Sequence, residues 1–226
     1  MSITQQLLAV EARINKACEL AKRPSQQVCL VAVSKTKPLS MVLEAYDQGQ
    51  RHFGENYLQD ALEKISANPY KDIVWHFIGA VQSNKTRSIA ESFAWVHTIE
   101  REKIAQRLND QRPAELPPLK VCLQVNISSE ANKSGVSLAD LPSLAAKVNA
   151  LPRLELAGLM CIPAANQTQA KQEQAFADMA KAQQQLQQTY PQLTALSMGM
   201  SADLELAIAH GSTMVRIGTD IFGARN

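Results

Sequence analysis

Short apolar runs alternate with longer amphipathic segments along most of the chain. The run VCLVAV at 28–33 is rich in β-branched residues, which favour strands, and similar runs recur at regular intervals. The N-terminal segment 3–22 instead carries its apolar residues three or four positions apart, which predicts a helix with one buried face. The residues of that face are Ile3, Leu7, Val10, Ile14 and Ala17.

This alternation continues to the C-terminus. The predicted strands are 28–33, 52–54, 73–79, 93–99, 120–127, 154–162, 194–198 and 214–217. The predicted helices are 3–22, 39–49, 57–67, 85–91, 102–109, 138–150, 169–189 and 202–210, with a helical stub at 220–222. The Gln-rich tract 183–188 falls inside a helical pattern, so we interpret it as a solvated helix face.

Strand–helix units repeated in this way predict an α/β fold with a parallel sheet. We expect one domain over residues 1–226, a single (β/α)8 TIM-type barrel with an extra N-terminal helix. The rival is a doubly wound open sheet, which usually has a glycine-rich phosphate loop after its first strand. Here the first strand is followed by SKTKP, which has no glycine.

Composition narrows the class of protein. The chain has 23 Lys and Arg against 21 Asp and Glu, a net charge of +2, which argues against a nucleic-acid surface or a polybasic membrane patch. No apolar stretch is long enough for a signal peptide or a membrane span. The four cysteines share no CxxC spacing and the histidines no metal-site spacing. We therefore expect a cytoplasmic protein that binds no metal, membrane or nucleic acid.

Polar residues after the strands mark the candidate site, because active sites of such barrels lie at the C-terminal ends of the strands. Lys35 follows the first strand and Asn56 the second. A partly desolvated amine at a barrel mouth is a nucleophile toward carbonyl compounds. The alternative for Lys35 is a solvated lysine at a strand end, and Lys37 lies near enough to point the same way.

The last two strands supply a second group of candidates. Ser201, Gly218 and Thr219 lie where such barrels often bind phosphate, although Ser201 and Thr219 could be ordinary helix caps. Arg216 lies inside an apolar strand and needs a partner, either a core carboxylate or a ligand. His76 is predicted to be a hydrogen-bonded core histidine, whereas His52, His97 and His210 are scattered. An amine, a phosphate cradle and an arginine together fit pyridoxal 5'-phosphate (PLP).

At these residues the chain resembles the pyridoxal phosphate homeostasis protein family over nearly its whole length. The matching motifs are VAVSKTKP (31–38), FGENY (53–57), WHFIGAVQSNK (75–85), NKSG (132–135), GLM (158–160), SMGMS (197–201) and RIGTDIFGAR (216–225). The resemblance implies a barrel related to the N-terminal domain of alanine racemase. It also implies that Lys35 carries PLP covalently as an aldimine.

The resemblance extends to the other site residues. It implies that Ser201, Gly218 and Thr219 hold the phosphate and that Arg216 faces the pyridine nitrogen. It further implies that Asn56 lies beside the pyridine ring and that Lys133 has a secondary role in binding the cofactor. The residues expected to bind the cofactor are therefore Lys35, Asn56, Arg216, Ser201, Gly218, Thr219 and Lys133.

The family resemblance implies a monomeric PLP carrier that maintains vitamin B6 and amino-acid balance and has no catalytic residues or established turnover. Apo forms of PLP-dependent enzymes are its expected partners. The alternative is a small fold-type III amino-acid racemase or lyase. The related racemases take a second base, a tyrosine, from an additional β domain, and this chain ends soon after its last predicted strand. We therefore expect binding without catalysis.

Overall fold

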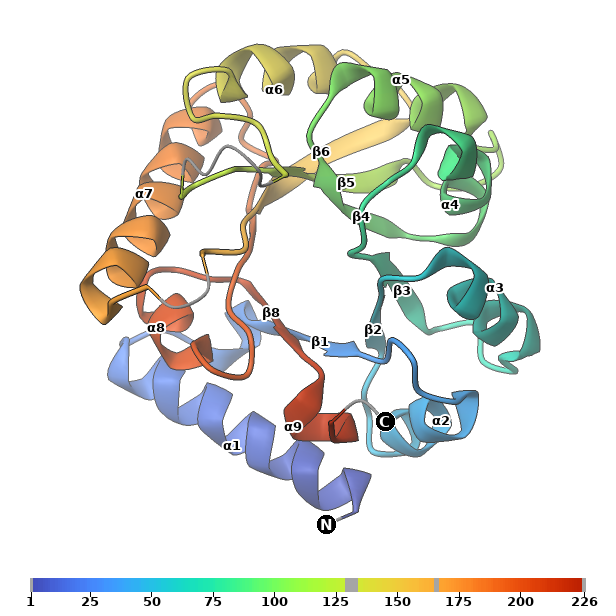
Figure 1. Ribbon diagram of the computed structural model, residues 1–226, viewed down its shortest axis with the longest axis vertical. Coiled ribbons are helices and arrows are strands. Elements are labelled where there is room, and N and C mark those ends of the chain that lie inside the picture. The colour runs from blue at the N-terminus through green and yellow to red at the C-terminus, as the bar shows by residue number, and fades with distance from the viewer. Residues whose placement is uncertain (1, 129–133, 165–166, 225–226) are drawn as a thin grey trace.

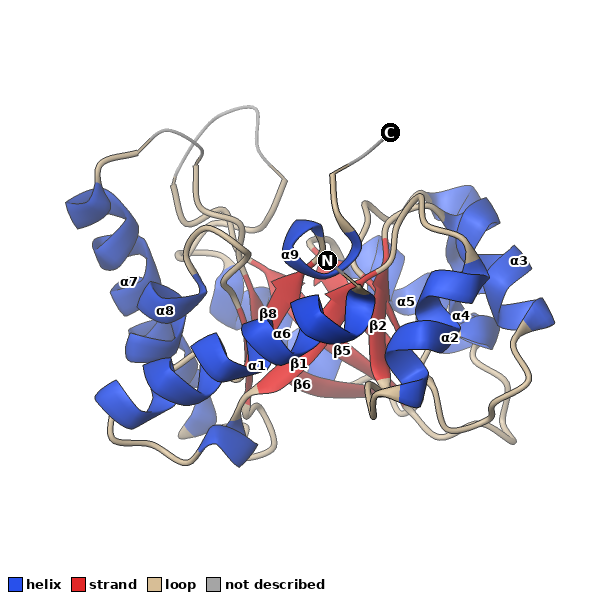
Figure 2. Ribbon diagram, turned by 90° about the horizontal axis from the view of Figure 1, so that it is seen from below, coloured by secondary structure: helices blue, strands red, loops and turns tan. Residues whose placement is uncertain are grey.

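The protein is a closed parallel β-barrel surrounded by helices. A computed structural model describes residues 2–128, 134–164 and 167–224. Strands β1 to β8 follow one another around the barrel in chain order, and β8 pairs with β1 to close it. Figures 1 and 2 show the helices as an outer layer around the strands. This architecture confirms the predicted (β/α)8 barrel with a preceding helix.

Each predicted strand and helix overlaps an observed one, with ends that differ by a few residues. The strands are β1 (Cys29–Val33), β2 (His52–Glu55), β3 (Val74–Phe77), β4 (Trp95–Ile99), β5 (Leu119–Gln124), β6 (Leu154–Met160), β7 (Ala195–Ser197) and β8 (Met214–Ile217). The helices are α1 (Ile3–Leu20), α2 (Leu39–Asp47), α3 (Leu58–Ala67), α4 (Thr86–Ser92), α5 (Glu102–Gln111), α6 (Leu141–Asn149), α7 (Gln169–Gln187), α8 (Leu204–Ala209) and α9 (Thr219–Phe222). Single 3-10 turns, η1 (Ser25–Gln27) and η2 (Ser83–Lys85), precede β1 and α4.

Helix α1 begins at a capping box and packs its apolar face inward. The Ser2 hydroxyl accepts a hydrogen bond from the Gln5 amide, and the Gln5 side chain accepts one from the Ser2 amide. Leu7 is 1% exposed, whereas its neighbour Leu8 is 60% exposed. The helix lies against α8 and α9, so the first and last helices of the chain are side by side (Figures 1 and 2).

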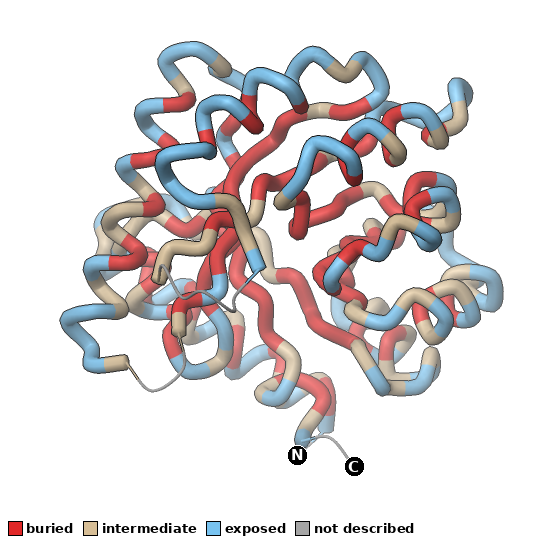
Figure 3. The backbone as a smooth tube through the Cα atoms, turned by 45° about the horizontal axis from the view of Figure 1, so that its top comes forward, coloured by how far each residue is buried: buried red, intermediate tan, exposed pale blue. Residues whose placement is uncertain are grey.

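The buried side chains form two layers. The larger layer lies between the strands and the helices, and Figure 3 shows the buried colour concentrated on the strands and on the inner faces of the helices. A smaller cluster, which includes Trp95, Cys122, Met160 and Met214, joins side chains from neighbouring strands. Burial raises the pKa of the Cys122 thiol to about 12, so it stays protonated. Within the described ranges, no helix is both long and apolar enough to cross a membrane.

Candidate functional site

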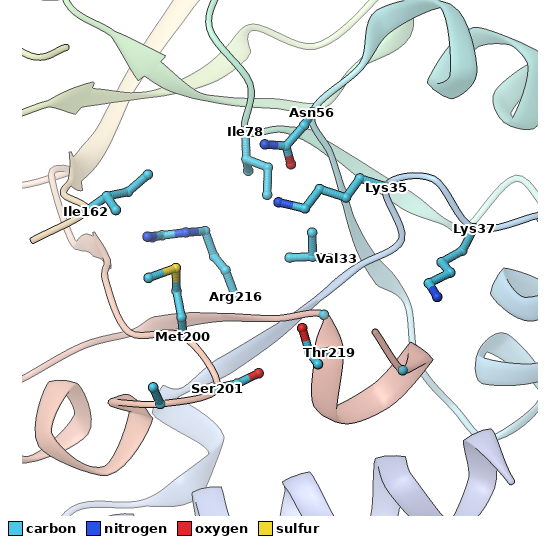
Figure 4. Close-up of a pocket in the computed structure, with 13 residues that line it drawn as sticks. Val33, Lys35, Lys37, Asn56, Ile78, Ile162, Met200, Ser201, Arg216 and Thr219 are labelled. Atoms are coloured by element: carbon cyan, nitrogen blue, oxygen red, sulfur yellow. The ribbon is translucent and has the colours of Figure 1, made fainter. Parts of the chain in front are cut away.

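A cavity of about 320 Å³ opens at the C-terminal ends of the strands. Its lining contains six of the predicted site residues: Lys35, Asn56, Ser201, Arg216, Gly218 and Thr219. The seventh, Lys133, lies outside the described residues. Residues of β8 and of the segments that follow β1, β2, β7 and β8 therefore meet in one place, as the barrel prediction required (Figure 4).

The two lysines after β1 differ in direction. Alternation along the strand places Val33 and Lys35 on the cavity side, and both line the cavity. In Figure 4 the half-buried Lys35 side chain extends into the cavity toward Asn56, whereas Lys37 points away. The Lys37 Nζ donates a hydrogen bond to the carbonyl of Ala224 at 2.7 Å. Lys35 is therefore the amine placed to meet a ligand.

Asn56 presents a polar atom beside Lys35. Its Oδ1 is buried and has no hydrogen-bond partner among the described residues. Buried polar atoms usually have a partner, so this oxygen is a position where a ligand donor would be stabilised. The loop geometry depends on Gly79, because a Cβ there would overlap the backbone carbonyl of Asn56.

Arg216 brings a positive charge to the barrel interior. Its residue is 5% exposed, and its guanidinium donates to the Ser197 hydroxyl at 2.7 Å and to the Cys161 carbonyl at 2.9 Å. These hydrogen-bond partners are neutral, and the buried Asp203 carboxylate acts on Arg216 through its charge and not through a hydrogen bond. Burial lowers the pKa of Arg216, but a guanidinium still remains protonated at neutral pH.

Three histidines continue this network through the barrel. The Ser197 hydroxyl bonds His97 Nδ1 at 2.8 Å, His97 Nε2 meets His76 Nδ1 at 2.9 Å, and His76 Nε2 meets His52 Nδ1 at 2.9 Å. The prediction of a hydrogen-bonded core His76 is confirmed. The view that His52 and His97 are scattered is wrong, because β2, β3 and β4 are neighbours in the barrel.

The histidine chain is uncharged at neutral pH. Burial, with Arg216 nearby, lowers the pKa of His97 to about 3, and burial also holds the pKa of His76 well below its ordinary value. The ring nitrogens lie too close to one another for a metal ion to fit between them. Across residues 2–128, 134–164 and 167–224, no group of side chains is arranged to hold a metal ion.

Ser201 and Thr219 line the other side of the cavity. Helix α8 begins at Leu204, so the prediction that Ser201 starts a helix is wrong and the residue lies in the preceding turn. Thr219 does start a helix, α9, and Gly218 is its N-cap. Figure 4 shows the two hydroxyls on the same side of the cavity, across from the Lys35 amine.

The acidic residues near these hydroxyls are held by Arg13 of α1. Its guanidinium donates to Glu205 at 2.7 Å, to Asp220 at 2.6 Å and to the Ser201 carbonyl at 2.9 Å. Asp203 instead accepts from the Met200 amide and is buried. Of these acids, none lines the cavity.

The cavity wall is cationic and apolar. Lys35 and Arg216 direct positive side chains to the cavity, Lys37 borders it with its amine turned away, and the described lining includes no carboxylate. Sequence reasoning missed the apolar wall, because its residues resemble ordinary core residues in an apolar pattern. Those residues are Val33, Ile78, Ile162 and Met200. Such a cavity suits a flat, partly apolar ligand that carries negative charge.

Comparisons with known proteins agree with this arrangement. The family model for the N-terminal domain of alanine racemase matches residues 6–226. The pyridoxal phosphate homeostasis protein of Escherichia coli is 53% identical over 227 residues, covering 99% of this chain and 97% of that protein. The protein of the same name from Pseudomonas aeruginosa is 54% identical over 225 residues, covering 100% and 96%.

Solved structures show the same fold. The structure of PipY from Synechococcus elongatus with PLP bound has a TM-score of 0.85 and 35% identity, covering 98% of this chain and 100% of that one. An alanine racemase from Corynebacterium glutamicum, at 16% identity, has a TM-score of 0.69 and is covered over 61% of its length. With full-length relatives above 50% identity, this chain belongs to the pyridoxal phosphate homeostasis protein family.

Proposed function

We propose that this protein binds PLP in the cavity, attached through Lys35, and acts as a carrier of the cofactor without catalytic turnover. The observation that carries the proposal is the lining itself, where the Lys35 amine, the Arg216 guanidinium and two hydroxyls meet without a described carboxylate. PipY, a relative of the same fold, has been solved with PLP bound. The names of the curated relatives refer to PLP homeostasis.

The lining residues fit the chemical groups of PLP. Bound PLP supplies an aldehyde, which condenses with a primary amine and releases water. Lys35 provides the amine, and the hydroxyls of Ser201 and Thr219 donate to the phosphate, where Gly218 permits close backbone approach. Arg216 donates a hydrogen bond toward the ring nitrogen. Asn56 offers its buried amide oxygen to a donor beside the ring.

The same lining supports binding without turnover. Racemisation needs a second proton-transferring group on the face opposite the lysine. The described lining includes no histidine, tyrosine, cysteine, aspartate or glutamate, and Lys37 is bonded to a carbonyl. Because Arg216 stays protonated and cannot give its proton to the ring nitrogen as an acid would, bound PLP is a weak electron sink.

Covalent labelling tests the attachment. The protein is mixed with PLP, reduced with borohydride and digested, and mass mapping is expected to place a pyridoxyl group on Lys35. Lys35→Ala should lose the visible absorption of the bound cofactor and keep its circular dichroism, whereas Lys37→Ala should retain the absorption. A label mainly on Lys37 or Lys133 would contradict the assignment.

A second experiment, on the protein with PLP bound, distinguishes a carrier from an enzyme. It is mixed with an apo PLP-dependent enzyme in the presence of a trap for free cofactor. We expect that enzyme to gain activity, and we expect negligible exchange of the α-proton when alanine is added to the loaded protein alone. Racemisation at enzyme-like rates, or cofactor that never leaves, would overturn the carrier proposal.

A further inference from the structure

A cluster of charged side chains is buried next to the cavity but does not line it. Lys64 of α3 is 4% exposed, and its Nζ donates to the Ser34 carbonyl at 2.8 Å, to Glu55 Oε1 at 2.8 Å and to Asp60 Oδ2 at 2.9 Å. The Ser34 hydroxyl also donates to Glu55 Oε1, at 2.6 Å. Asp60 Oδ2 accepts from the Thr36 amide at 3.2 Å. A single lysine thus joins β1, β2 and α3.

The residues that this cluster holds are the chain neighbours of cavity residues. Ser34 and Thr36 flank Lys35, and Glu55 directly precedes Asn56. The backbone is therefore anchored on both sides of Lys35 and on one side of Asn56. Thr36 has a φ of +62°, in the left-handed region that non-glycine residues seldom adopt. The hydrogen bond from the Thr36 amide to Asp60 stabilises that conformation.

Stability alone does not explain such a cluster. Removing a buried ion pair from water costs free energy that its attraction often fails to recover, and a well-packed apolar pair of similar size is commonly as stable. Glu55 is fully buried, and its Oε2 has no hydrogen-bond partner among the described residues. Burial raises the pKa of Glu55 despite the adjacent Lys64. The arrangement is costly, and what it fixes is the backbone that carries Lys35.

We propose that Lys64 and Glu55 are positioning residues that orient Lys35 for attack on the aldehyde of PLP. The inference rests on the proposed function and adds residues outside the cavity lining. It separates the covalent step from the recognition of the phosphate, because the hydroxyls of Ser201 and Thr219 belong to other elements, which the cluster does not hold.

Two ligands distinguish these steps. Pyridoxine 5'-phosphate has the same ring and phosphate as PLP, but an alcohol replaces the aldehyde, so it cannot bond to Lys35. In the double variant Lys64→Met/Glu55→Leu, which removes both buried charges, the Kd for PLP is expected to rise at least about tenfold. The Kd for pyridoxine 5'-phosphate is expected to change less than about twofold, and borohydride labelling of Lys35 should fall in parallel with PLP binding.

Two further variants serve as a control and as a milder test of the cluster. Lys171→Met alters an exposed lysine of α7 and should leave both ligands bound as in the wild type. Asp60→Asn, at a side chain that is 36% exposed, provides a milder variant in case the double variant does not fold. It should weaken PLP binding by a few-fold and spare pyridoxine 5'-phosphate.

Three results would overturn the proposal. Native PLP affinity in the double variant, or in Asp60→Asn if the double variant does not fold, would exclude a positioning role. Equal loss of both ligands would indicate general disruption of the cavity. If the wild-type protein binds pyridoxine 5'-phosphate but is not labelled by PLP at Lys35, the proposed function fails at its covalent step and the positioning role fails with it. If PLP labels Lys35 of the wild-type protein and the variants keep the wild-type affinity for PLP, only the positioning role is refuted and the proposed function stands.

Discussion

Ser201 reaches the cavity from the turn before α8, and Thr219 reaches it from the first residue of α9. Their hydroxyls lie on the same side of the cavity (Figure 4), and the Arg13 guanidinium donates to the Ser201 carbonyl. Glu205 and Asp220 are turned to Arg13, Asp203 accepts from the Met200 amide, and none of the three lines the cavity. A phosphate bound here would thus gain hydrogen bonds without meeting a like charge.

Removing one hydroxyl tests that role. Ser201→Ala is expected to weaken PLP binding by about 1–2 kcal/mol, the scale of a hydrogen bond to a charged group. Unphosphorylated pyridoxal should bind as before, because it has no phosphate to lose contact with. Titration with both ligands, followed by absorbance, measures the difference. The assignment fails if both ligands weaken equally.

Residue position along the strands made much of the cavity predictable. Lys35 and Asn56 follow strand ends, and a barrel brings all such ends to one face. Nothing in the sequence marks Lys64 in the same way, because it lies in an ordinary helical pattern. Its role depends on Ser34 and Glu55, which only the packing of α3 on two strands brings within reach.

At the scale of elements, α1 joins the two ends of the chain. Its apolar face packs toward α8 and α9, and its Arg13 forms ion pairs with Glu205 and Asp220 of those helices. These ion pairs are partly exposed, so we expect them to contribute less than the apolar contacts. The helix is therefore held mainly by buried side chains such as Leu7.

Adjacent leucines of α1 provide a matched test. Leu7→Ala should lower the free energy of unfolding by about 2–5 kcal/mol, since it leaves a cavity in the core. Leu8→Ala makes the same chemical change at a largely exposed position, and we expect a change below about 0.5 kcal/mol. Urea unfolding measures both. Similar losses in the two variants would contradict this account of α1.

The sequence pattern predicted which segments are helices better than it predicted which of their side chains are buried. The tract 183–188 forms the last turn and the C-cap of α7, as the helical pattern predicted, but Gln183 is not part of a solvated face. It is 8% exposed, and its amide donates to the Thr194 carbonyl at 2.8 Å. A glutamine that satisfies a backbone carbonyl just before β7 has the same sequence signature as one that faces water, so periodicity cannot separate them.

For the whole molecule, the barrel interior differs from the layer outside it. The layer between strands and helices contains the Lys64–Glu55 cluster within a mainly apolar packing, whereas the interior contains Arg216 and the histidine chain. Those histidines remain neutral when folded because burial disfavours their charged forms. In the unfolded chain the same rings would take up protons near their ordinary pKa of 6.5.

Because of this difference, we expect the free energy of unfolding to decrease as the pH is lowered. The folded pKa values are depressed, so the stabilisation is present above pH 6.5 and is lost as pH falls toward the folded value of about 3 for His97. For His97 this loss amounts to about 2 kcal/mol between pH 7 and pH 5, and protonation of His76 adds to it in the same direction. Urea unfolding at both pH values measures the loss, and ring resonances of His76 and His97 should not titrate over that range. Equal stability at the two pH values would show that these rings titrate alike when folded and unfolded.

The histidine chain also has a direction. A neutral imidazole donates through one nitrogen and accepts through the other, so consecutive rings that bond to each other must all carry the proton on the same nitrogen. At one end Arg216 can only donate to Ser197, which leaves the serine proton free to be given to His97. That choice would place a proton on Nε2 of all three rings, His52 included. A change of tautomer at His52, near the opposite end of the barrel, therefore requires the whole row to reverse, down to the hydroxyl that contacts Arg216.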